Sequence, residues 1–220
     1  RRTDPLYVLD LNNPADPRTV GELAMPGYSD YLFPIAGGNW LVGVGHDATA
    51  SGQVEGLKVA LLDVRDPAAP RVAGSVTLGS RGSVSAADYS RHGVSILEAG
   101  SQARIALPAL LTEPAGSGNG VGTQGLTRFE ADTARGTLVQ KSTVVATRFD
   151  GTSADTARYF RYDITRERSA QSALGAYYLS GGQVTFTPPG SGASCVLAGN
   201  PAPLSSGTAT SGTVTANATG

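Results

Sequence analysis

Short runs of apolar residues alternate with proline-rich polar segments from the start of the chain. The run LYVLDL has the length and the Leu, Val and Tyr content typical of a β-strand. The residues that follow, NNPADPR, contain two prolines, which lack the N–H that a sheet requires, and an Asn that can bond back to the backbone. The segment TVGELAMPG then resumes the apolar pattern. Together these segments predict a β-hairpin.

The same hairpin occurs twice in the sequence. Leu9–Gly21 and Leu62–Gly74 are 53 positions apart and share seven of thirteen residues, both prolines included. A hairpin of two strands does not bury its apolar face by itself. The repeat therefore predicts neighbouring copies that pack against one another.

The pattern continues in weaker form in the second half of the chain. Gly125–Phe149 again contains a strand, a polar turn and a strand, and Ala157–Ile164 followed by Gly175–Thr187 predicts a further pair. Four related units spaced by roughly 40–55 residues are typical of β-propeller blades, each a four-stranded sheet. The predicted fold is all-β, with about three to four mostly antiparallel blades of a larger ring. The other blades of that ring are expected upstream of Arg1.

Composition divides the chain near residue 188. We expect residues 1–188 to form the C-terminal part of a propeller and residues 189–220 to form a tail rich in Ser, Thr, Gly and Ala. The last 52 residues, Ser169–Gly220, contain no charged side chain. Such a tail could add an extended strand to a sheet edge, in this ring or in another protein chain, or it could be a neutral linker to a further domain.

The overall composition limits the classes of partner. The 29 Gly and 13 Pro among 220 residues, with only 16% charged residues, indicate many tight turns and few solvated helices. The net charge is -1, so no basic surplus exists for binding nucleic acid or an anionic membrane. No apolar run approaches the ~18–20 residues that cross a bilayer. Cys195 has no second cysteine to pair with, and we expect it to be a small buried hydrophobe.

The segment DATASGQVE resembles a calcium-binding loop. Asp47, Thr49 and Ser51 place oxygens at alternate positions, a glycine permits a sharp turn, and Glu55 can return a carboxylate. Ca²⁺ prefers about six to eight oxygen ligands from such alternating side chains, backbone carbonyls and water. Because two of the three alternate ligands are hydroxyls, the sequence predicts weak calcium binding, with a solvated hairpin loop as the alternative.

Other candidates for chemistry carry less information. The chain has two histidines, His46 and His92, and one cysteine, so a zinc or copper site would need carboxylates as well. The sequence contains no Gly-x-Ser-x-Gly motif of a serine nucleophile. The Arg and Tyr side chains of Arg158–Ser169 could grip a carboxylate or a sugar acid, with an ion-paired surface as the alternative.

Three segments of the first half carry a resemblance to a known family. They are GYSDYLFPI, GLKVALLDVRDPAAP and LGSRGSVSAADY. With the later RFEADTARGTLV, they resemble the bacterial family of secreted proteins with a C-terminal β-propeller distantly related to WD-type repeats. The resemblance covers roughly Asp4–Val184. It implies a propeller that is secreted or exposed at the cell envelope, commonly behind a signal peptide, and it implies no established activity.

These observations predict a secreted, periplasmic or cell-surface propeller that acts as a binding or assembly module. The expected partners are upstream propeller blades, another protein chain joined through the tail, or a glycan, but neither nucleic acid nor a membrane span. Calcium is the only cofactor that the sequence suggests. The alternative is an extracytoplasmic enzyme, a hydrolase or a metal-dependent enzyme, with its site in the propeller funnel and partly on missing upstream blades. In such an enzyme, carboxylates and His46 would converge on one pocket.

Overall fold

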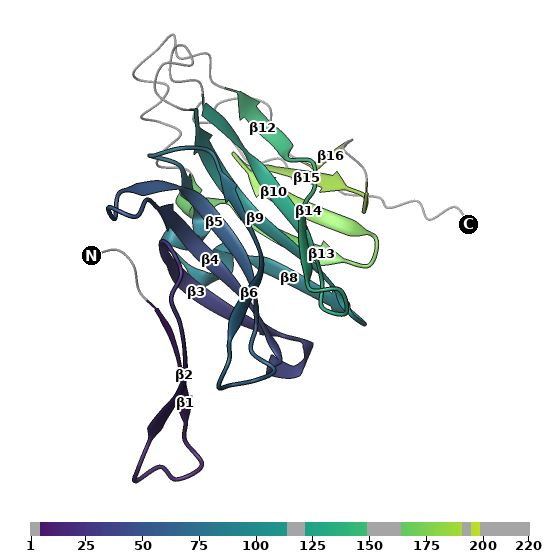
Figure 1. The fold of residues 1–220 in the computed structure, drawn as a ribbon. Helices are drawn as coiled ribbons and strands as arrows, with labels where there is room; N and C mark the ends of the chain where they lie inside the picture. Colours follow the sequence, from purple (N-terminus) through teal and green to yellow (C-terminus); the bar gives the residue numbers. More distant parts are fainter. Residues whose placement is uncertain (1–4, 114–121, 149–163, 191–194, 199–220) are drawn as a thin grey trace.

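The computed structural model describes residues 5–113, 122–148, 164–190 and 195–198. In this part of the chain every long element is a β-strand, and the helical elements are short 3₁₀ turns. The strands form three sheets of four strand positions each and a separate two-stranded hairpin (Figure 1). The predicted all-β fold with antiparallel four-stranded sheets is therefore confirmed. No helix among the described residues has the length and apolar character to cross a membrane.

The first sheet is a meander of four consecutive antiparallel strands. The central strand β5 is buried on both faces from Gly56 to its end, whereas the edge strands of this sheet keep exposed residues. A 3₁₀ turn, η1 (Ala36–Gly38), connects the first two strands. The strands are β3 (Tyr28–Ile35), β4 (Trp40–Ala48), β5 (Val54–Asp63) and β6 (Arg71–Leu78).

The second sheet has the same four positions, but each of its edge positions is split between two short strands. The strands β7 and β8 both pair with β9, and β11 and β12 both pair with β10. Two 3₁₀ turns, η2 (Ala86–Asp88) and η3 (Arg91–Gly93), interrupt the first edge. The strands are β7 (Val84–Ser85), β8 (Ser95–Ala99), β9 (Gln102–Thr112), β10 (Gly122–Asp132), β11 (Thr137–Gln140) and β12 (Val144–Arg148).

The third sheet follows the turn η4 (Ile164–Arg166) and again runs in chain order. The predicted turn SGG lies between its second and third strands. Its last strand belongs to the predicted tail and pairs with β15. The strands are β13 (Arg168–Ser172), β14 (Gly175–Ser180), β15 (Gln183–Thr187) and β16 (Cys195–Ala198).

The two copies of the sequence repeat adopt the same strand pairing. Both hairpins contain a bulge at the same repeat position, between Val8 and Leu9 in the first copy and between Leu61 and Leu62 in the second. A bulge places one extra residue in one strand and bends the pair. The repeated sequence therefore determines the position of the bulge as well as the two strands of the hairpin. The first copy consists of β1 (Leu6–Asp10) and β2 (Arg18–Leu23), and the second consists of β5 and β6.

The proline-containing turns of the two copies are also the same. The amide of Asp16 donates to the carbonyl of Asn13 (3.0 Å), and the amide of Ala69 donates to the carbonyl of Asp66 (3.1 Å). In each turn the side-chain oxygen of the same Asn or Asp also accepts a hydrogen bond from the amide two residues later. This is the backbone bond that the sequence predicted for these residues.

A glycine at the same repeat position lets each hairpin approach the next one. A Cβ atom at Gly21 would overlap the carbonyl oxygen of Pro67, in the turn between β5 and β6. A Cβ atom at Gly74 would lie 3.3 Å from Leu138, which follows the turn between β10 and β11. Each hairpin thus packs against the corresponding hairpin of the following sheet, as the repeat predicted.

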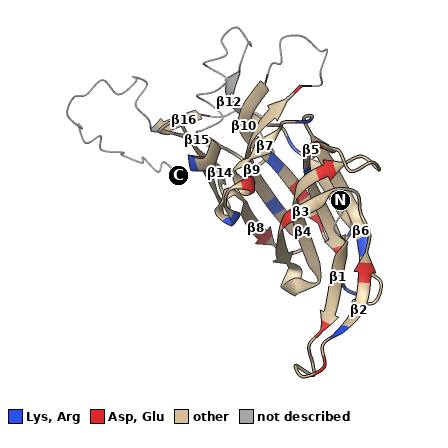
Figure 2. Cartoon of the chain, turned by 90° about the vertical axis from the view of Figure 1, so that its left-hand side faces the viewer, with Lys and Arg blue, Asp and Glu red and all other residues tan. Residues whose placement is uncertain are grey.

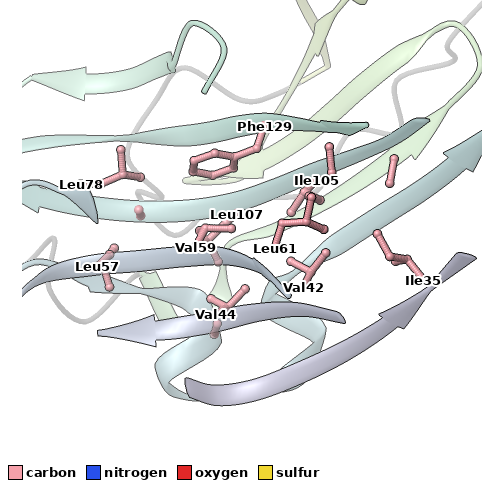
Figure 3. Packing of buried hydrophobic residues seen from close by; sticks show 14 of the residues in the cluster. Ile35, Val42, Val44, Leu57, Val59, Leu61, Leu78, Ile105, Leu107 and Phe129 are labelled. Carbon is pink, nitrogen blue, oxygen red and sulfur yellow. The ribbon is translucent and has the colours of Figure 1, made fainter. Parts of the chain in front are cut away.

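The main hydrophobic core lies between the first and second sheets (Figure 3). Alternate residues of β4 and β5 point into it from one side, and alternate residues of β9 point into it from the other. A second, smaller core joins the second sheet to the third and includes Ala106, Leu126 and Tyr178. The labelled residues in Figure 3 are Ile35, Val42, Val44, Leu57, Val59, Leu61, Leu78, Ile105, Leu107 and Phe129.

Three sequence-based expectations on the C-terminal half have different outcomes. The predicted strand at Ala157–Ile164 lies outside the described residues except for Ile164, which is in η4. The boundary near residue 188 stays a prediction, since of the tail only residues 189–190 and 195–198 are described. The expectation that Cys195 is buried is wrong, because its side chain is exposed on β16.

Candidate functional site

The N-terminal hairpin β1–β2 differs from its copy in what covers it. Tyr7 and Leu9 are each 54% exposed, whereas Ala60 and Leu62, which lie 53 positions later, are at most 2% exposed. In the first sheet β4 pairs with the edge of β5 that faces away from β6, but among the described residues β1 pairs only with β2. Both views show the hairpin projecting from the sheets (Figure 1, Figure 2). It therefore presents an open strand edge and an apolar face.

The residues of the predicted calcium loop lie at the end of β4 and the start of β5. The hydroxyls of Thr49 and Ser51 are 2.8 Å apart, and Thr49 accepts a hydrogen bond from the amide of Gln53. Glu55 is exposed at the start of β5. The loop thus has the geometry of a closed hairpin turn, and its calcium binding stays a prediction.

Asp47 already has a cationic neighbour within this region. Its carboxylate accepts hydrogen bonds from the Lys58 ammonium (3.1 Å) and the Thr77 hydroxyl (2.8 Å). Burial raises the pKa of Asp47, but the hydrogen bonds from Thr77 and Lys58 outweigh burial and lower it below its usual value. A calcium ion at Asp47 would have to displace or share this lysine.

The strongest constellation of metal-ligating side chains is the set Asp30, His46 and Asp88, which we call the Asp–His cluster. Their potential ligand atoms all lie within 4.8 Å of one another. His46 Nε2 is 3.2 Å from Asp88 Oδ2. His46 is 7% exposed, Asp88 is partly buried and Asp30 is exposed. The sequence singled out His46 and the need for carboxylates, and the structure supplies two.

A strand bulge and a close strand approach position the cluster. The pairing of β3 with β4 shifts between Ser29 and Tyr31, so Asp30 is the extra residue of a bulge. Opposite the bulge, a Cβ atom at Gly45 would overlap the carbonyl oxygen of Tyr28, so β3 approaches β4 closely there. Bulges redirect a side chain away from the regular alternation of a strand. The bulge therefore accounts for a carboxylate beside His46.

A family model described as a beta propeller domain matches residues 1–188. The chain belongs to this family. The three sheets of the structure are therefore blades of a beta propeller, and the N-terminal hairpin is a copy of β5–β6, the outer half of the first blade.

Two curated relatives of this beta propeller are archaeal. An uncharacterized protein of Methanocaldococcus jannaschii is 46% identical over 66 residues, which are 30% of this chain and 10% of that protein. An uncharacterized protein of Archaeoglobus fulgidus is 37% identical over 111 residues, which are 48% of this chain and 17% of that protein. The chain thus spans less than a fifth of each relative. No solved structure matches the chain significantly.

The beta propeller also contains a buried carboxylate that sequence reasoning placed in a charged segment without recognising its burial. Glu167 is 2% exposed and accepts hydrogen bonds from Ser180 Oγ (2.6 Å), Tyr178 Oη (2.5 Å) and Gln124 Nε2. Burial and the negative charge of Glu167 raise the pKa of Tyr178, so its phenol remains a donor. These bonds join β10 to β14 across the interface between the second and third blades. Residues 158–163 of the same segment lie outside the described part.

The sequence reasoning missed the two carboxylates of the Asp–His cluster. Asp30 and Asp88 each precede a tyrosine, in the segments YSDY and AADY. Each segment lies near the inner edge of a blade, at β3 in the first and just after β7 in the second. A comparison of the blade edges, rather than of the outer hairpins alone, could have paired these residues.

Proposed function

We propose that this propeller segment is a binding and assembly module, and that the N-terminal hairpin is the place where it joins further strands. The observation that carries the proposal is the contrast between the two copies of the repeat. Leu62 is fully buried, but Leu9 at the same position is 54% exposed. An exposed apolar face beside an unpaired strand edge is a site for adding strands.

The occupant that fits is a strand pair of the kind formed by β3–β4, supplied by a further propeller segment. In the first blade, β4 pairs with β5 along its whole length: Trp40 lies opposite Asp63 at one end, and Ala48 lies opposite Val54 at the other. β1 repeats β5, so a β4-like strand would find the same donors and acceptors on β1. The side chains of the added strand on the same face as Tyr7 and Leu9 would be apolar, so that they lie beside these two exposed side chains as cross-strand neighbours.

We propose that this module lies outside the cytoplasm. The family resemblance carried by GYSDYLFPI and the related segments supports a secreted or envelope-exposed location. Fractionation of cells that express the natural full-length protein would test it. Recovery of the protein solely in the cytoplasm would contradict the proposed location and leave the strand-addition proposal in place.

The chain itself offers the test of strand addition. At the repeat offset of 53, Arg1 corresponds to Val54, so residues 28–53 can be duplicated and joined directly before Arg1. The added β3–β4 hairpin should pair with β1 as β4 pairs with β5. We expect those amides of Leu6–Asp10 that point away from β2 to exchange at least about tenfold more slowly, because the open edge of β1 becomes paired.

A matched control separates pairing from a mere increase in length. As the control, the same duplication carries Gly43→Pro in the added copy alone. Gly43 belongs to a hydrogen-bonded β4–β5 pair, so proline there removes a central hydrogen bond of the added strand to β1. The control should leave exchange at Leu6–Asp10 as in the original chain. Equal exchange in the original, duplicated and proline-containing chains would overturn the proposal.

A further inference from the structure

The Asp–His cluster lies where two blades meet. Asp30 and His46 belong to β3 and β4 of the first blade, and Asp88 ends η2, which interrupts the inner edge of the second blade. Asp88 and His46 are 42 residues apart in sequence but 3.2 Å apart in space. A ligand held by all three side chains would therefore bridge the two blades.

The buried histidine continues the apolar stripe of β4. Trp40, Val42, Val44 and His46 alternate along this strand, and the first three lie in the core between the blades. His46 replaces an apolar residue at the end of this stripe, where its imidazole contacts Asp88 instead of an aliphatic side chain. Because this imidazole is mostly buried, its ring nitrogens are held in a fixed direction, as a metal ligand requires.

Neighbouring groups hold the ligand atoms in place. The Ser85 hydroxyl donates to Asp88 Oδ1 at 2.6 Å, which leaves Asp88 Oδ2 directed at His46. The Tyr28 ring lies 5.5 Å from the His46 ring, centre to centre. Such outer contacts are what orients ligands in metal sites.

The charges in the cluster favour a cation. Although Asp30 is exposed as a residue, partial desolvation of its carboxyl raises its pKa, the negative charge of Asp88 raises it further, and His46 opposes this rise. Lys58 pairs with Asp47. Asp47 follows His46 directly in β4, so its side chain projects from the opposite face of the strand. A divalent cation between the carboxylates would replace their repulsion with attraction.

We propose that Asp30, His46 and Asp88 bind a divalent transition metal of the zinc class and thereby fasten the first blade to the second. One imidazole nitrogen and two carboxylate oxygens form a mixed set that suits zinc better than calcium, which takes oxygen ligands alone. Zinc bonds of about 2.0–2.2 Å require the ligand atoms to move slightly closer together. The exposed side chain of Asp30 is free to make that movement. Water or a partner ligand completes a tetrahedral site.

The test is calorimetric titration of Zn²⁺ into the chelator-treated protein, with the visible absorption of Co²⁺ as a second readout of coordination. We expect one site in the wild type. Asp30→Asn and Asp88→Asn should each weaken Zn²⁺ binding by at least about tenfold, and His46→Gln should also change the Co²⁺ spectrum. Asp30→Asn is the most informative variant, since an exposed residue can be replaced without disturbing the fold.

Two variants serve as matched controls. Asp47→Asn removes the adjacent carboxylate on the opposite face of β4, and His92→Gln removes the other histidine; both should bind Zn²⁺ as the wild type does. Circular dichroism of each metal-free variant checks folding. A protein that binds no Zn²⁺, or that binds it equally well after Asp30→Asn and His46→Gln, overturns the proposal. Ca²⁺ binding that Asp47→Asn removes, without Zn²⁺ binding, would favour the predicted calcium loop instead.

Discussion

The two copies of the hairpin repeat have the same backbone course and different surroundings. Leu62 in β5 is fully buried, whereas Leu9 in β1 is 54% exposed, although both follow the same bulge and precede the same kind of turn. The local sequence is thus sufficient to set the strands, bulge and turn. The burial of this leucine depends on the surroundings of the hairpin, and among the described residues only the second copy has a strand paired with its other edge.

The largest expected effect comes from shortening the same leucine in each copy. Leu62→Ala removes a fully buried side chain and should lower the free energy of unfolding by about 2–5 kcal/mol. Leu9→Ala acts on an exposed side chain, and we expect a change below about 0.5 kcal/mol. Urea unfolding followed by circular dichroism measures both. Equal losses would mean that Leu9 is covered in solution, and the contrast between the copies would be lost.

The hairpins were predictable because local chemistry determines them. The prolines at positions 14 and 17 and their counterparts at 67 and 70 end the strands, and Asn13 and Asp66 close the turns with their own side chains. The turn at Gly181 and Gly182 followed from the same reasoning. The split inner edge of the second blade was not predictable in this way. The turns η2 and η3 lie between β7 and β8, and no proline or glycine pattern like that of the hairpins marks them in the sequence.

The Asp–His cluster was beyond sequence reasoning for a geometric reason. Regular strand alternation assigns a facing direction to every residue, and a bulge changes that direction at Asp30. Asp88 reaches His46 only because the second blade packs on the first. The aspartates and the histidine were visible in the sequence. Their proximity depends on the bulge in the β3–β4 pair and on the interface between the first and second blades.

A smaller effect is expected where the first hairpin meets the next one. Gly21→Ala would place a methyl group on the carbonyl oxygen of Pro67, whereas Gly74→Ala would meet Leu138 at 3.3 Å, where a small shift suffices. We expect Gly21→Ala to weaken attachment of the N-terminal hairpin by about 1–3 kcal/mol. Because this hairpin has few other neighbours, the loss should appear as faster amide exchange over Leu6–Leu23.

The global unfolding midpoint distinguishes the two glycines. Gly21→Ala should leave that midpoint nearly unchanged, since we expect the three blades to fold without the hairpin. Gly74 lies in β6 of the first blade, so any stability that Gly74→Ala removes should appear as a lower midpoint of global unfolding. If Gly21→Ala lowers the global midpoint as much as Leu62→Ala does, the hairpin is an integral part of the cooperative unit.

The smallest contrast concerns the aspartate that ends the first strand of each copy. Asp63 accepts hydrogen bonds from the guanidinium groups of Arg65 and Arg71, and Arg65 also lies over the Trp40 ring at 5.0 Å. At the corresponding position, Asp10 accepts a hydrogen bond from the amide of Asn12. Hydrogen bonds from Arg65, which outweigh the effect of burial, lower the pKa of Asp63 from 3.8 to about 2.

Asp63→Asn should therefore cost about 1 kcal/mol at neutral pH, a modest value because both arginines are more than half exposed and screened by solvent. A carboxyl whose pKa is lower in the folded state stabilises the protein above its unfolded pKa, here 3.8, and loses this effect as the pH falls toward about 2. The difference between wild type and Asp63→Asn should thus shrink as the pH falls from about 5 toward about 2, whereas Asp10→Asn should stay within about 0.5 kcal/mol of the wild type at neutral pH. Urea midpoints across this range measure both. A difference that does not change with pH would assign the effect of Asp63 to hydrogen-bond geometry rather than to its charge.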